Sequence, residues 1–464
     1  MLEPSPLLQV EPDPVPSGAR FKLSRYNVGK GALLFNTLTG ALVDLTSRQE
    51  YELGHVRATG QPADLSECES LRRLGFVADA EVDELAAVWG GFLLSQGSAK
   101  PAVLTIAPIL DCNFGCEYCF ETHRPGVMSP TVRDQLIQFL RARHAASPVS
   151  LHVVWFGGEP LMAQGVIFDL ASKFDELVAE GVLRSWGSEL ITNGLLLCDG
   201  LVGRLRQEAR VSRIQITIDG DQEHHDARRF LKRNRTGTFV RVVENAVQAA
   251  KVVPVGIRVN VDRTNQDCLE TMMRQFADAG MFQSGSISIN LALVEPFTEA
   301  DVIRNATTLL SAQEFATLRE EFLCRAQREG WPAHEAAASS VVSGVCQVDN
   351  KNAFVVAPDG ALMKCWAELG NDPEVVGHLG KRETWQEDML GTLEDRDPLD
   401  DKGCRTCKLL PMCMGGCPQQ RALWRKKGVK HCPPLKYAFG GYLDKLAKEG
   451  RATDNSRCGD CHAD

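Results

Sequence analysis

From residue 102 onward, short apolar runs alternate with longer amphipathic stretches, which predicts strands separated by helices. The expected strands cover 103–106, 151–156, 189–192, 214–219, 255–261 and 286–293, and the expected helices cover 131–144, 166–180, 201–208, 239–250 and 267–279. In 239–250, for example, Phe239, Val242, Val243 and Ala246 fall on one helical face. Strands that alternate with helices predict a parallel sheet, closed or partial as a barrel.

Three of these strands alternate strictly between apolar and polar residues. Isoleucines in 214–219 are separated by Gln215, Thr217 and Asp219, and in 255–261 the polar positions include Arg258 and Asn260. Successive residues of a strand face opposite sides, so one face can meet the helices while the other lines the interior. A packed barrel interior is branched and apolar, so a polar interior predicts a polar ligand inside.

The remaining segments differ in pattern and predict further domains. Residues 1–98 contain short strands near 21–28, 32–35 and 41–45, a Thr39-Gly40 turn, and helices ending with 82–94. We therefore expect a small winged-helix-like α+β domain over 1–98 and the barrel over 99–330. A cysteine-rich domain follows over 331–440, and a tail over 441–464 ends the chain.

Composition excludes several function classes. The chain has 464 residues, a formal net charge of −9 and 24% charged residues, and an acidic protein is a poor partner for nucleic acid. The basic run 228–235 is interpreted as a solvated loop. No apolar run is long enough to span a membrane, and the N-terminus lacks the pattern of a secretory signal. A cytoplasmic location is expected, where thiols stay reduced, so sixteen cysteines predict metal binding.

Three cysteines follow the first strand of the barrel region with the spacing Cys-x3-Cys-x2-Cys, at Cys112, Cys116 and Cys119. Three thiolates on one short loop can hold three irons of a cubane cluster and leave the fourth iron for a small molecule. A structural zinc site uses four ligands, and this loop contains no fourth cysteine or histidine. We interpret the nearby His123 as a loop residue.

The motifs around this loop resemble those of the radical S-adenosylmethionine (SAM) superfamily. They are Tyr118 before the last cysteine, Gly157-Gly158-Glu159-Pro160 after the second strand, Thr192-Asn193-Gly194 after the third, and Asp219-Gly220 with His225-Asp226 and Arg229 after the fourth. The resemblance implies an α/β fold with a partial (β/α)6 TIM-like barrel. It also implies a [4Fe–4S] cluster on the three cysteines, with SAM on the open iron.

The resemblance further implies which residues bind SAM. Gly157, Gly158 and Glu159 would bind the amino group, Tyr118 belongs to the cysteine motif, and Thr192, Asn193, Asp219, Arg229 and Arg258 are candidates for ribose and carboxylate contacts. The alternative for each candidate is a polar residue at the barrel rim. Reductive cleavage of SAM would give methionine and a 5′-deoxyadenosyl radical, with the protein supplying binding and orientation.

Seven further cysteines have a spacing that resembles the SPASM extension, a domain that binds auxiliary iron–sulfur clusters. The resemblance implies one cluster on Cys404, Cys407, Cys413 and Cys432 and another on Cys346, Cys365 and Cys417, both expected to be [4Fe–4S]. A zinc ribbon is the alternative. Two cubanes need eight ligands, and the stretch 336–344 offers serines but no cysteine. A substrate group or a tail cysteine would fill the open position.

The tail contains Cys458 and Cys461. We consider them candidate hydrogen donors, cluster ligands or a redox pair; the alternative is that they belong to an unstructured end. The other isolated cysteines, Cys68, Cys198, Cys268 and Cys324, are expected to be buried in packing.

The resemblance implies an enzyme that acts on a peptide or protein. We expect a maturase that forms an oxidative crosslink, C–C or thioether, in a ribosomally made precursor peptide, which the leading domain would bind as an added strand. The alternatives are an anaerobic sulfatase-maturing enzyme, which makes formylglycine, and a peptide epimerase. The sulfatase-maturing family has an Asp where this chain has Trp366. A flavodoxin- or ferredoxin-type protein would supply electrons. A pure electron carrier is disfavoured by the Gly-Gly-Glu-Pro element.

Overall fold

The computed structural model describes residues 18–95, 101–333, 346–370, 375–385 and 397–448. The chain divides into two compact units, each of which combines segments distant in sequence. One unit joins the residues before 97 to those after 394. The other joins 97–336 to 346–394. The cysteine-rich segment predicted over 331–440 therefore contributes to both units.

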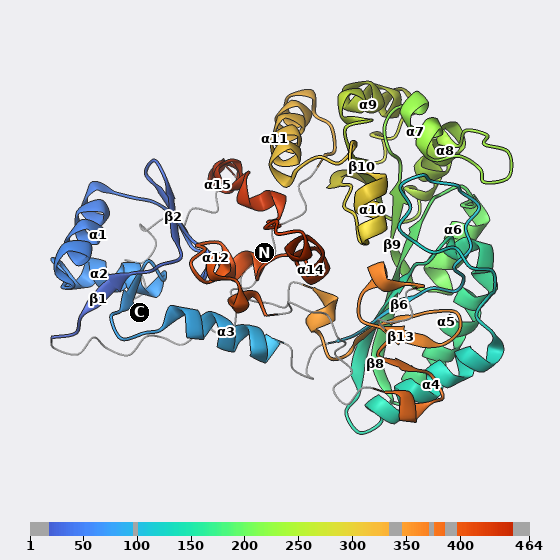
Figure 1. The fold of residues 1–464 in the computed structure, drawn as a ribbon, viewed down its shortest axis with the longest axis horizontal. Coiled ribbons are helices and arrows are strands. Elements are labelled where there is room, and N and C mark those ends of the chain that lie inside the picture. Colours follow the sequence, from blue (N-terminus) through green and yellow to red (C-terminus); the bar gives the residue numbers. More distant parts are fainter. Residues whose placement is uncertain (1–17, 96–100, 334–345, 371–374, 386–396, 449–464) are drawn as a thin grey trace, which may run out of the picture. The chain divides into compact units, whose positions relative to one another are not determined.

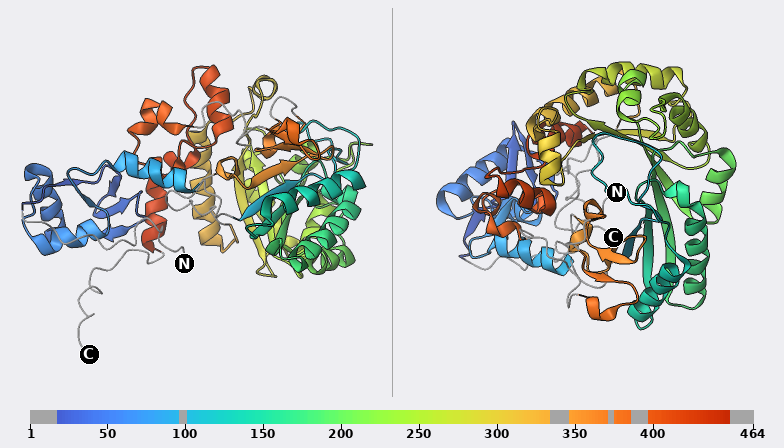
Figure 2. Two further views of the ribbon diagram at one scale, coloured as in Figure 1. Left: turned by 90° about the horizontal axis from the view of Figure 1, so that it is seen from below. Right: turned by 45° about the vertical axis from the view of Figure 1, so that its right-hand side comes forward.

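A nine-stranded sheet forms the centre of the unit that contains residues 97–336. Its order is β11-β10-β9-β8-β7-β6-β12-β13-β14. Six neighbouring strands are parallel: β6 (Ala102–Ile106), β7 (Val149–Trp155), β8 (Leu183–Thr192), β9 (Val211–Thr217), β10 (Val255–Val261) and β11 (Ile287–Leu293). Helices follow these strands and lie on the outer face of the curved sheet (Figure 2). The predicted partial (β/α)6 barrel is confirmed.

The five predicted helices begin and end close to the predicted positions, and three further α-helices in the described part of this unit were not predicted. The predicted ones are α4 (Pro130–His144), α5 (Gln164–Ala179), α6 (Asp199–Gln207), α8 (Phe239–Ala249) and α9 (Leu269–Asp278). The further ones are α7 (Gln222–Arg228), with α10 (Glu299–Arg304) and α11 (Ala312–Glu329) after β11. Strand β8 begins six residues before the predicted start, because Arg184, Ser185 and Gly187 interrupt the apolar pattern there. The predicted alternation is confirmed: Ile216 and Val259 are fully buried in the core, while Asn260 lies on the other face.

Three short strands extend this sheet beyond β6. β12 (Ala353–Val356) pairs parallel with β6, and β13 (Ala361–Met363) and β14 (Gly377–His378) continue it antiparallel. Sequence reasoning did not predict this extension. Its first strand places the region after Cys346 beside the strand that leads into the Cys112 loop.

The other unit begins with a small α+β arrangement. β1 (Phe21–Leu23) pairs with β5 (Val77–Asp79), and β2 (Asn27–Lys30), β3 (Leu33–Asn36) and β4 (Leu42–Asp44) form an antiparallel sheet. The helices are α1 (Ser47–Thr59), α2 (Leu65–Arg73) and α3 (Glu84–Ser95). The strand predicted over 21–28 is two strands, because a turn at Arg25 and Tyr26 interrupts it.

The C-terminal helices of this unit pack against that sheet, as Figure 1 shows for α15 beside β2. They are α12 (Lys402–Arg405), α13 (Leu410–Cys413), α14 (Pro418–Lys426) and α15 (Phe439–Lys448). Phe439 and Leu443 of α15 share a buried cluster with Phe35 and Leu42. No helix in the described parts of the chain is long and apolar enough to cross a membrane.

Candidate active site

The loop with Cys112, Cys116 and Cys119 follows β6, at the end of the sheet where the parallel strands finish. Two backbone hydrogen bonds clamp it to the segment 230–232: Gly115 N–H donates to the Phe230 carbonyl (3.0 Å), and Lys232 N–H donates to the Asn113 carbonyl (2.9 Å). The side-chain amide of Asn193 donates to the Asn113 side-chain oxygen (2.7 Å), and its nitrogen lies 3.8 Å from the Cys112 Sγ. The first half of the loop is therefore held by the segment after α7 and by Asn193 after β8.

Burial changes the acidity of the three thiols. It raises the pKa of Cys112 and of Cys119 to about 12, and it also raises the pKa of Cys116. Thiols with such values keep their protons at neutral pH in the absence of a cation. A metal that binds here must release those protons and supply the positive charge that stabilises three thiolates.

Two glycines allow the segment after β7 to approach the base of this loop. Gly157 has φ +105°, a conformation that side chains rarely adopt. A Cβ on Gly158 would lie 2.2 Å from the Asp111 carbonyl oxygen. The Glu159 amide donates to that same oxygen (3.0 Å). The Gly-Gly-Glu sequence thus places Glu159 next to the start of the cysteine loop.

The Glu159 carboxylate is fully buried and holds two neighbouring strands together. It accepts hydrogen bonds from the Thr192 hydroxyl (2.8 Å), the Asn193 amide (2.9 Å) and the Leu161 amide (3.0 Å). Burial raises the pKa of Glu159, while these donors oppose that change. Thr192 and Asn193, predicted to contact a ligand, therefore also position Glu159.

A second polar group lies inside the barrel around the Tyr118 hydroxyl. That hydroxyl donates to Asp219, and it accepts hydrogen bonds from Arg229 (2.6 Å) and Asn260 (3.3 Å). The Asn260 backbone amide donates to Asp219 (2.8 Å), and Arg258 donates to the Asn260 side chain (2.8 Å). Four predicted residues, from the cysteine loop, the end of β9, the end of α7 and strand β10, thus meet in one network.

The His225-Asp226 pair fixes the loop that carries Arg229. His225 is fully buried, accepts from the Asp219 amide (3.2 Å) and contacts the Thr238 hydroxyl (3.1 Å). Burial holds the pKa of His225 well below its usual range, so the ring is neutral. Asp226 accepts from the Thr238 and Phe239 amides at the start of α8 (2.7 and 2.8 Å).

The basic run 228–235 is only partly the solvated loop that we expected. Arg228 and Arg229 are largely buried, because Arg228 pairs with Asp262 (2.7 Å) and Arg229 lies within the Tyr118 network. Arg235 is exposed and lies over the Phe230 ring. Two of the five cations in this run are therefore largely buried, where they can meet an anionic group.

Two buried polar atoms near the cysteine loop lack a hydrogen-bond partner within the described residues, and burial raises the pKa of one of the groups, Glu121, to about 7. The Arg229 Nε donor and the Glu121 Oε2 acceptor are buried and have no hydrogen-bond partner in the described structure. Each such atom is costly unless a ligand satisfies it. A small molecule with both a carboxylate and an amino group supplies the missing acceptor and donor, so these atoms fit the amino-acid end of SAM.

Comparisons with known proteins agree with this geometry. The family model "Radical SAM superfamily" matches residues 106–276. The serine-type anaerobic sulfatase-maturating enzyme of Bacteroides thetaiotaomicron is 28% identical over 32% of this chain and 36% of its own length. The sporulation killing factor maturation protein SkfB of Bacillus subtilis is 25% identical over 46% of this chain and 52% of its own length. The match thus spans about a third to a half of these two relatives.

A longer match decides the family. The serine-type anaerobic sulfatase-maturating enzyme of Klebsiella aerogenes is 30% identical over 334 residues, which cover 66% of this chain and 77% of that enzyme. The chain belongs to the radical SAM superfamily. Membership in this enzyme family implies a [4Fe–4S] cluster and SAM, and the cysteine loop and the unpaired atoms described above fit both.

Solved structures show the same fold. The chain matches anSMEcpe with bound AdoMet and Cp18Cys peptide with a TM-score of 0.57 at 19% identity, over 75% of this chain and all of the other. It matches Streptococcus suis SuiB bound to precursor peptide SuiA with a TM-score of 0.50 at 14% identity, over 86% and 95%. At such identities the likeness concerns the fold alone.

Four of the auxiliary cysteines surround one small pocket in this radical SAM protein. Cys404, Cys407, Cys413 and Cys432 all line it, together with Lys430 and Lys436. The structure thus brings together the complete ligand set that the SPASM resemblance implies for one cluster. These four thiols come from α12, the turn after it, α13 and the loop after α14, and such a set fits a cubane.

The other predicted set is only partly assembled within one unit. Cys346 and Cys365 share a small buried cluster, whereas Cys417 belongs to the other unit. That ligand set stays a prediction. Cys458 and Cys461 lie outside the described residues, as does the serine stretch 336–344. Cys198 and Cys324 are exposed, so the expectation that they are packing residues was wrong, while Cys68 and Cys268 are buried as expected.

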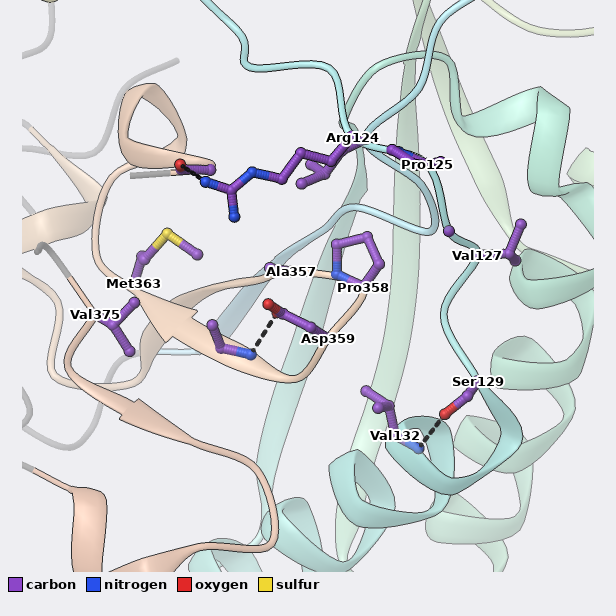
Figure 3. Close-up of a pocket in the computed structure, with 14 residues that line it drawn as sticks. Arg124, Pro125, Val127, Ser129, Val132, Ala357, Pro358, Asp359, Met363 and Val375 are labelled. Atoms are coloured by element: carbon purple, nitrogen blue, oxygen red, sulfur yellow. Dashed lines mark hydrogen bonds between the residues drawn. The ribbon is translucent and has the colours of Figure 1, made fainter. Parts of the chain in front are cut away.

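A separate hollow of about 320 Å³ lies between the loop before α4 and the β12–β13 hairpin (Figure 3). Its charged side chains already serve the fold. Arg124 donates to the Gly370 carbonyl (2.8 Å), and the Asp359 carboxylate accepts from the Ala361 amide (3.1 Å). The groups suited to SAM chemistry therefore gather in the barrel and not in this hollow.

Sequence reasoning missed several residues of these sites. Asn260 joins Tyr118 to Arg258, and Arg228 lies 4.9 Å from the centre of the Tyr118 ring. The strict alternation in 255–261 placed Asn260 on the polar face and could have identified it. Lys430 and Lys436 lie close to Cys432 in sequence, but only the structure shows that they line its pocket.

Proposed function

We propose that this chain is a peptide-modifying maturase that uses a SAM-derived radical to form a crosslink in a ribosomally made precursor. When bound, the cluster on Cys112, Cys116 and Cys119 supplies the electron that cleaves SAM into methionine and a 5′-deoxyadenosyl radical. The observation that carries the proposal is the juxtaposition of this loop with the unpaired Arg229 and Glu121 atoms. A site that binds SAM on an iron–sulfur cluster needs three thiols next to groups that can bind its carboxylate and its amino group.

The protein's own groups would orient SAM and exclude water. Glu159 sits beneath the loop in a fully buried position, and the Tyr118 network fixes Asp219 and Arg229 at the ends of the next strands. Preorganised groups in a dry site act without reorganisation at the moment of reaction. Arg229 would neutralise the SAM carboxylate, and Asp219 is placed for a ribose contact.

The residue after Cys365 supports a reaction other than sulfatase maturation. The Trp366 ring centre lies 5.2–5.8 Å from those of Phe120, Phe156 and Phe297. In the sulfatase-maturing family this position is an Asp. Here it belongs to an aromatic cluster next to the cysteine loop, and it provides no carboxylate to accept a substrate proton.

Formylglycine formation is the second candidate, because the Klebsiella aerogenes relative is a sulfatase-maturating enzyme. Peptide epimerisation is the third reaction that the same radical could start. The three reactions give different products. A crosslink removes two hydrogens without forming an aldehyde, whereas formylglycine is an aldehyde that a hydrazide traps. Epimerisation leaves the peptide mass unchanged in water but adds deuterium in heavy water.

The test is anaerobic incubation of the reconstituted full chain with SAM, dithionite and candidate precursor peptides encoded near its gene. We expect 5′-deoxyadenosine and a peptide lighter by two hydrogens that does not react with the hydrazide. A hydrazide-reactive product would favour formylglycine. Absence of 5′-deoxyadenosine from protein with its full iron content would overturn radical SAM chemistry itself. In the cell, a flavodoxin- or ferredoxin-type protein would replace dithionite, in a reducing compartment such as the cytoplasm.

We further propose that the leading domain binds the precursor in a groove of about 610 Å³ between β1, the β2–β3 hairpin and α1. Phe21, Leu34 and Leu53 give this groove an apolar floor. Its charged lining residues are three cations and one carboxylate: Lys22, Arg57, Lys408 and Glu50. An extended peptide with apolar side chains and some acidic residues matches this lining.

A glycine on α1 allows a sharp test of the groove. Gly54 lines it, and a Cβ added there meets no atom within 4 Å. The substitution Gly54→Trp would fill the groove without disturbing the fold, so precursor affinity should fall at least about tenfold. Gly54→Ala is the matched control and should bind normally. Fluorescence anisotropy of labelled precursor measures both, and equal affinity in the two variants would exclude this groove.

A further inference from the structure

A tyrosine hydroxyl is buried without a partner beside the four-cysteine pocket. Tyr26 is fully buried, and its hydroxyl has no hydrogen bond within the described structure. Its side chain belongs to a buried cluster with Cys404, Leu410 and Met414. The charged groups that act on its hydroxyl are, in decreasing order, Arg25, Glu84, Asp83 and Cys407. A buried hydroxyl is costly unless it is satisfied, which points to an acceptor that the polypeptide itself does not provide.

The neighbours of Tyr26 hold it against the loop between Cys404 and Cys407. The Arg25 guanidinium donates to the Arg405 carbonyl, and the Thr37 hydroxyl donates to the Lys408 carbonyl. The Thr37 amide in turn donates to the Tyr26 carbonyl (3.1 Å). Three hydrogen bonds therefore fix the ring relative to two of the four thiols, and all these residues belong to one unit.

The charges around the same pocket are positive. Lys436 Nζ donates to the Cys432 Sγ (3.5 Å), and Lys430 interacts with Cys404 and Cys432. Asp401 partly offsets Lys430, at 3.2 Å from its Nζ. The residues that line the pocket include these two lysines and His431 but no carboxylate. Hydrogen bonds to sulfur and nearby positive charge both favour the reduced, more negative state of a cluster.

We infer that Tyr26 donates a hydrogen bond to the sulfur of a cluster bound by Cys404, Cys407, Cys413 and Cys432, and that Tyr26, Lys430 and Lys436 together raise the reduction potential of that cluster. The inference rests on the proposed function, which places a cluster there. It makes the leading domain part of the electronic environment of the auxiliary cluster, in addition to its proposed role in precursor binding.

A raised potential suits an electron acceptor in crosslinking. One substrate hydrogen atom passes to the 5′-deoxyadenosyl radical and leaves a substrate radical. When this radical closes a bond to a second substrate atom, the second hydrogen leaves as a proton and one electron must be accepted. Cys404, Cys407, Cys413 and Cys432 would hold an oxidised cluster that could accept this one electron, so atoms and charges balance.

The test is the midpoint potential of this cluster, followed by electron paramagnetic resonance during a redox titration. The full chain carries Cys112→Ala, Cys116→Ala and Cys119→Ala, so that only auxiliary signals remain, and the signal lost on adding Cys413→Ala identifies the relevant cluster. With Tyr26→Phe we expect the ratio of reduced to oxidised cluster at fixed potential to fall about tenfold, which corresponds to about 59 mV for one electron. Tyr51→Phe, which alters an exposed tyrosine of the same domain, should change nothing.

Lys436 provides a second, independent variant because its side chain reaches the pocket from a loop. Lys436→Gln should lower the midpoint and Lys436→Arg should preserve it. Electron–nuclear double resonance of the wild type should also detect an exchangeable proton that Tyr26→Phe removes. An unchanged midpoint in Tyr26→Phe and Lys436→Gln with full iron content overturns the inference alone. Protein that binds no iron at these four cysteines overturns the cluster assignment in the proposed function.

Discussion

At the residue scale, the site depends on side chains that position other side chains. Glu159 is buried next to the cysteine loop and accepts hydrogen bonds from Thr192 and Asn193. Thr192 and Asn193, which were expected to bind a ligand, therefore also position Glu159. Tyr118 links Asp219 to Arg229 in the same way. The most constrained position is Gly158, where even one methyl group would meet the Asp111 carbonyl.

Gly158→Ala should therefore disrupt the cysteine loop. The added Cβ would lie 2.2 Å from a backbone oxygen, and such overpacking costs about 1–3 kcal/mol. If this strain is relieved by moving the loop, 5′-deoxyadenosine formation should fall about tenfold or more. The measurement is product formation per mole of bound iron. Gly165→Ala, whose new Cβ meets open space, should retain full activity, and equal rates for both variants would contradict the argument.

At the element scale, the α7–α8 connection carries Arg229 into the barrel. Its geometry is set by Asp226, which accepts both amides at the beginning of α8, and by His225, which joins Thr238 to Asp219. His225 and Asp226 thus act mainly through hydrogen bonds to backbone amides. These bonds orient Arg229, whose guanidinium donates to the Tyr118 hydroxyl.

Asp226→Ala should destabilise this connection. Loss of an acceptor for two helix-start amides costs about 1–2 kcal/mol, as for other N-terminal caps, and Arg229 should become less well positioned for SAM. We expect a lower free energy of unfolding together with weaker SAM binding, measured by denaturant titration and calorimetry. Asp226→Asn keeps one oxygen acceptor and should recover most of both. Weak SAM binding without any loss of stability would point instead to a direct contact.

At the scale of the whole molecule, the two ends of the chain fold together. Residues 18–95 and 397–448 share two buried clusters, one with Cys404 and one with α15. The leading domain therefore shares its core with the C-terminal segment of the same unit. Its hydrophobic contacts reach the cysteine pocket, so the groove proposed for the precursor and the four-cysteine pocket belong to one compact unit.

Cys413→Ala should separate SAM cleavage from product formation. We expect the loss of about four irons per chain, the content of one cubane, while SAM cleavage by the cluster on Cys112, Cys116 and Cys119 continues. Crosslinked peptide should not accumulate, because the surplus electron has no acceptor. Iron analysis and mass spectrometry measure both effects. Cys324→Ala, at an exposed isolated cysteine, is the control, and normal crosslinking by Cys413→Ala would refute the acceptor role.

The sequence by itself determined the barrel and the chemistry of its loop. Periodicity predicted the six parallel strands because each must bury an apolar face against helices, and local spacing revealed Cys112, Cys116 and Cys119 because one short loop holds all three. The strand-end motifs were also visible in sequence, since each lies directly after a strand.

Only the tertiary structure decided which distant residues meet. The β12–β14 extension, the Arg228–Asp262 pair and the position of Tyr26 beside Cys404 join residues far apart in the chain. Such contacts arise from the packing of whole elements, which no local pattern encodes. The same packing divides the cysteine-rich segment between two units, although the spacing of its cysteines resembles one continuous motif.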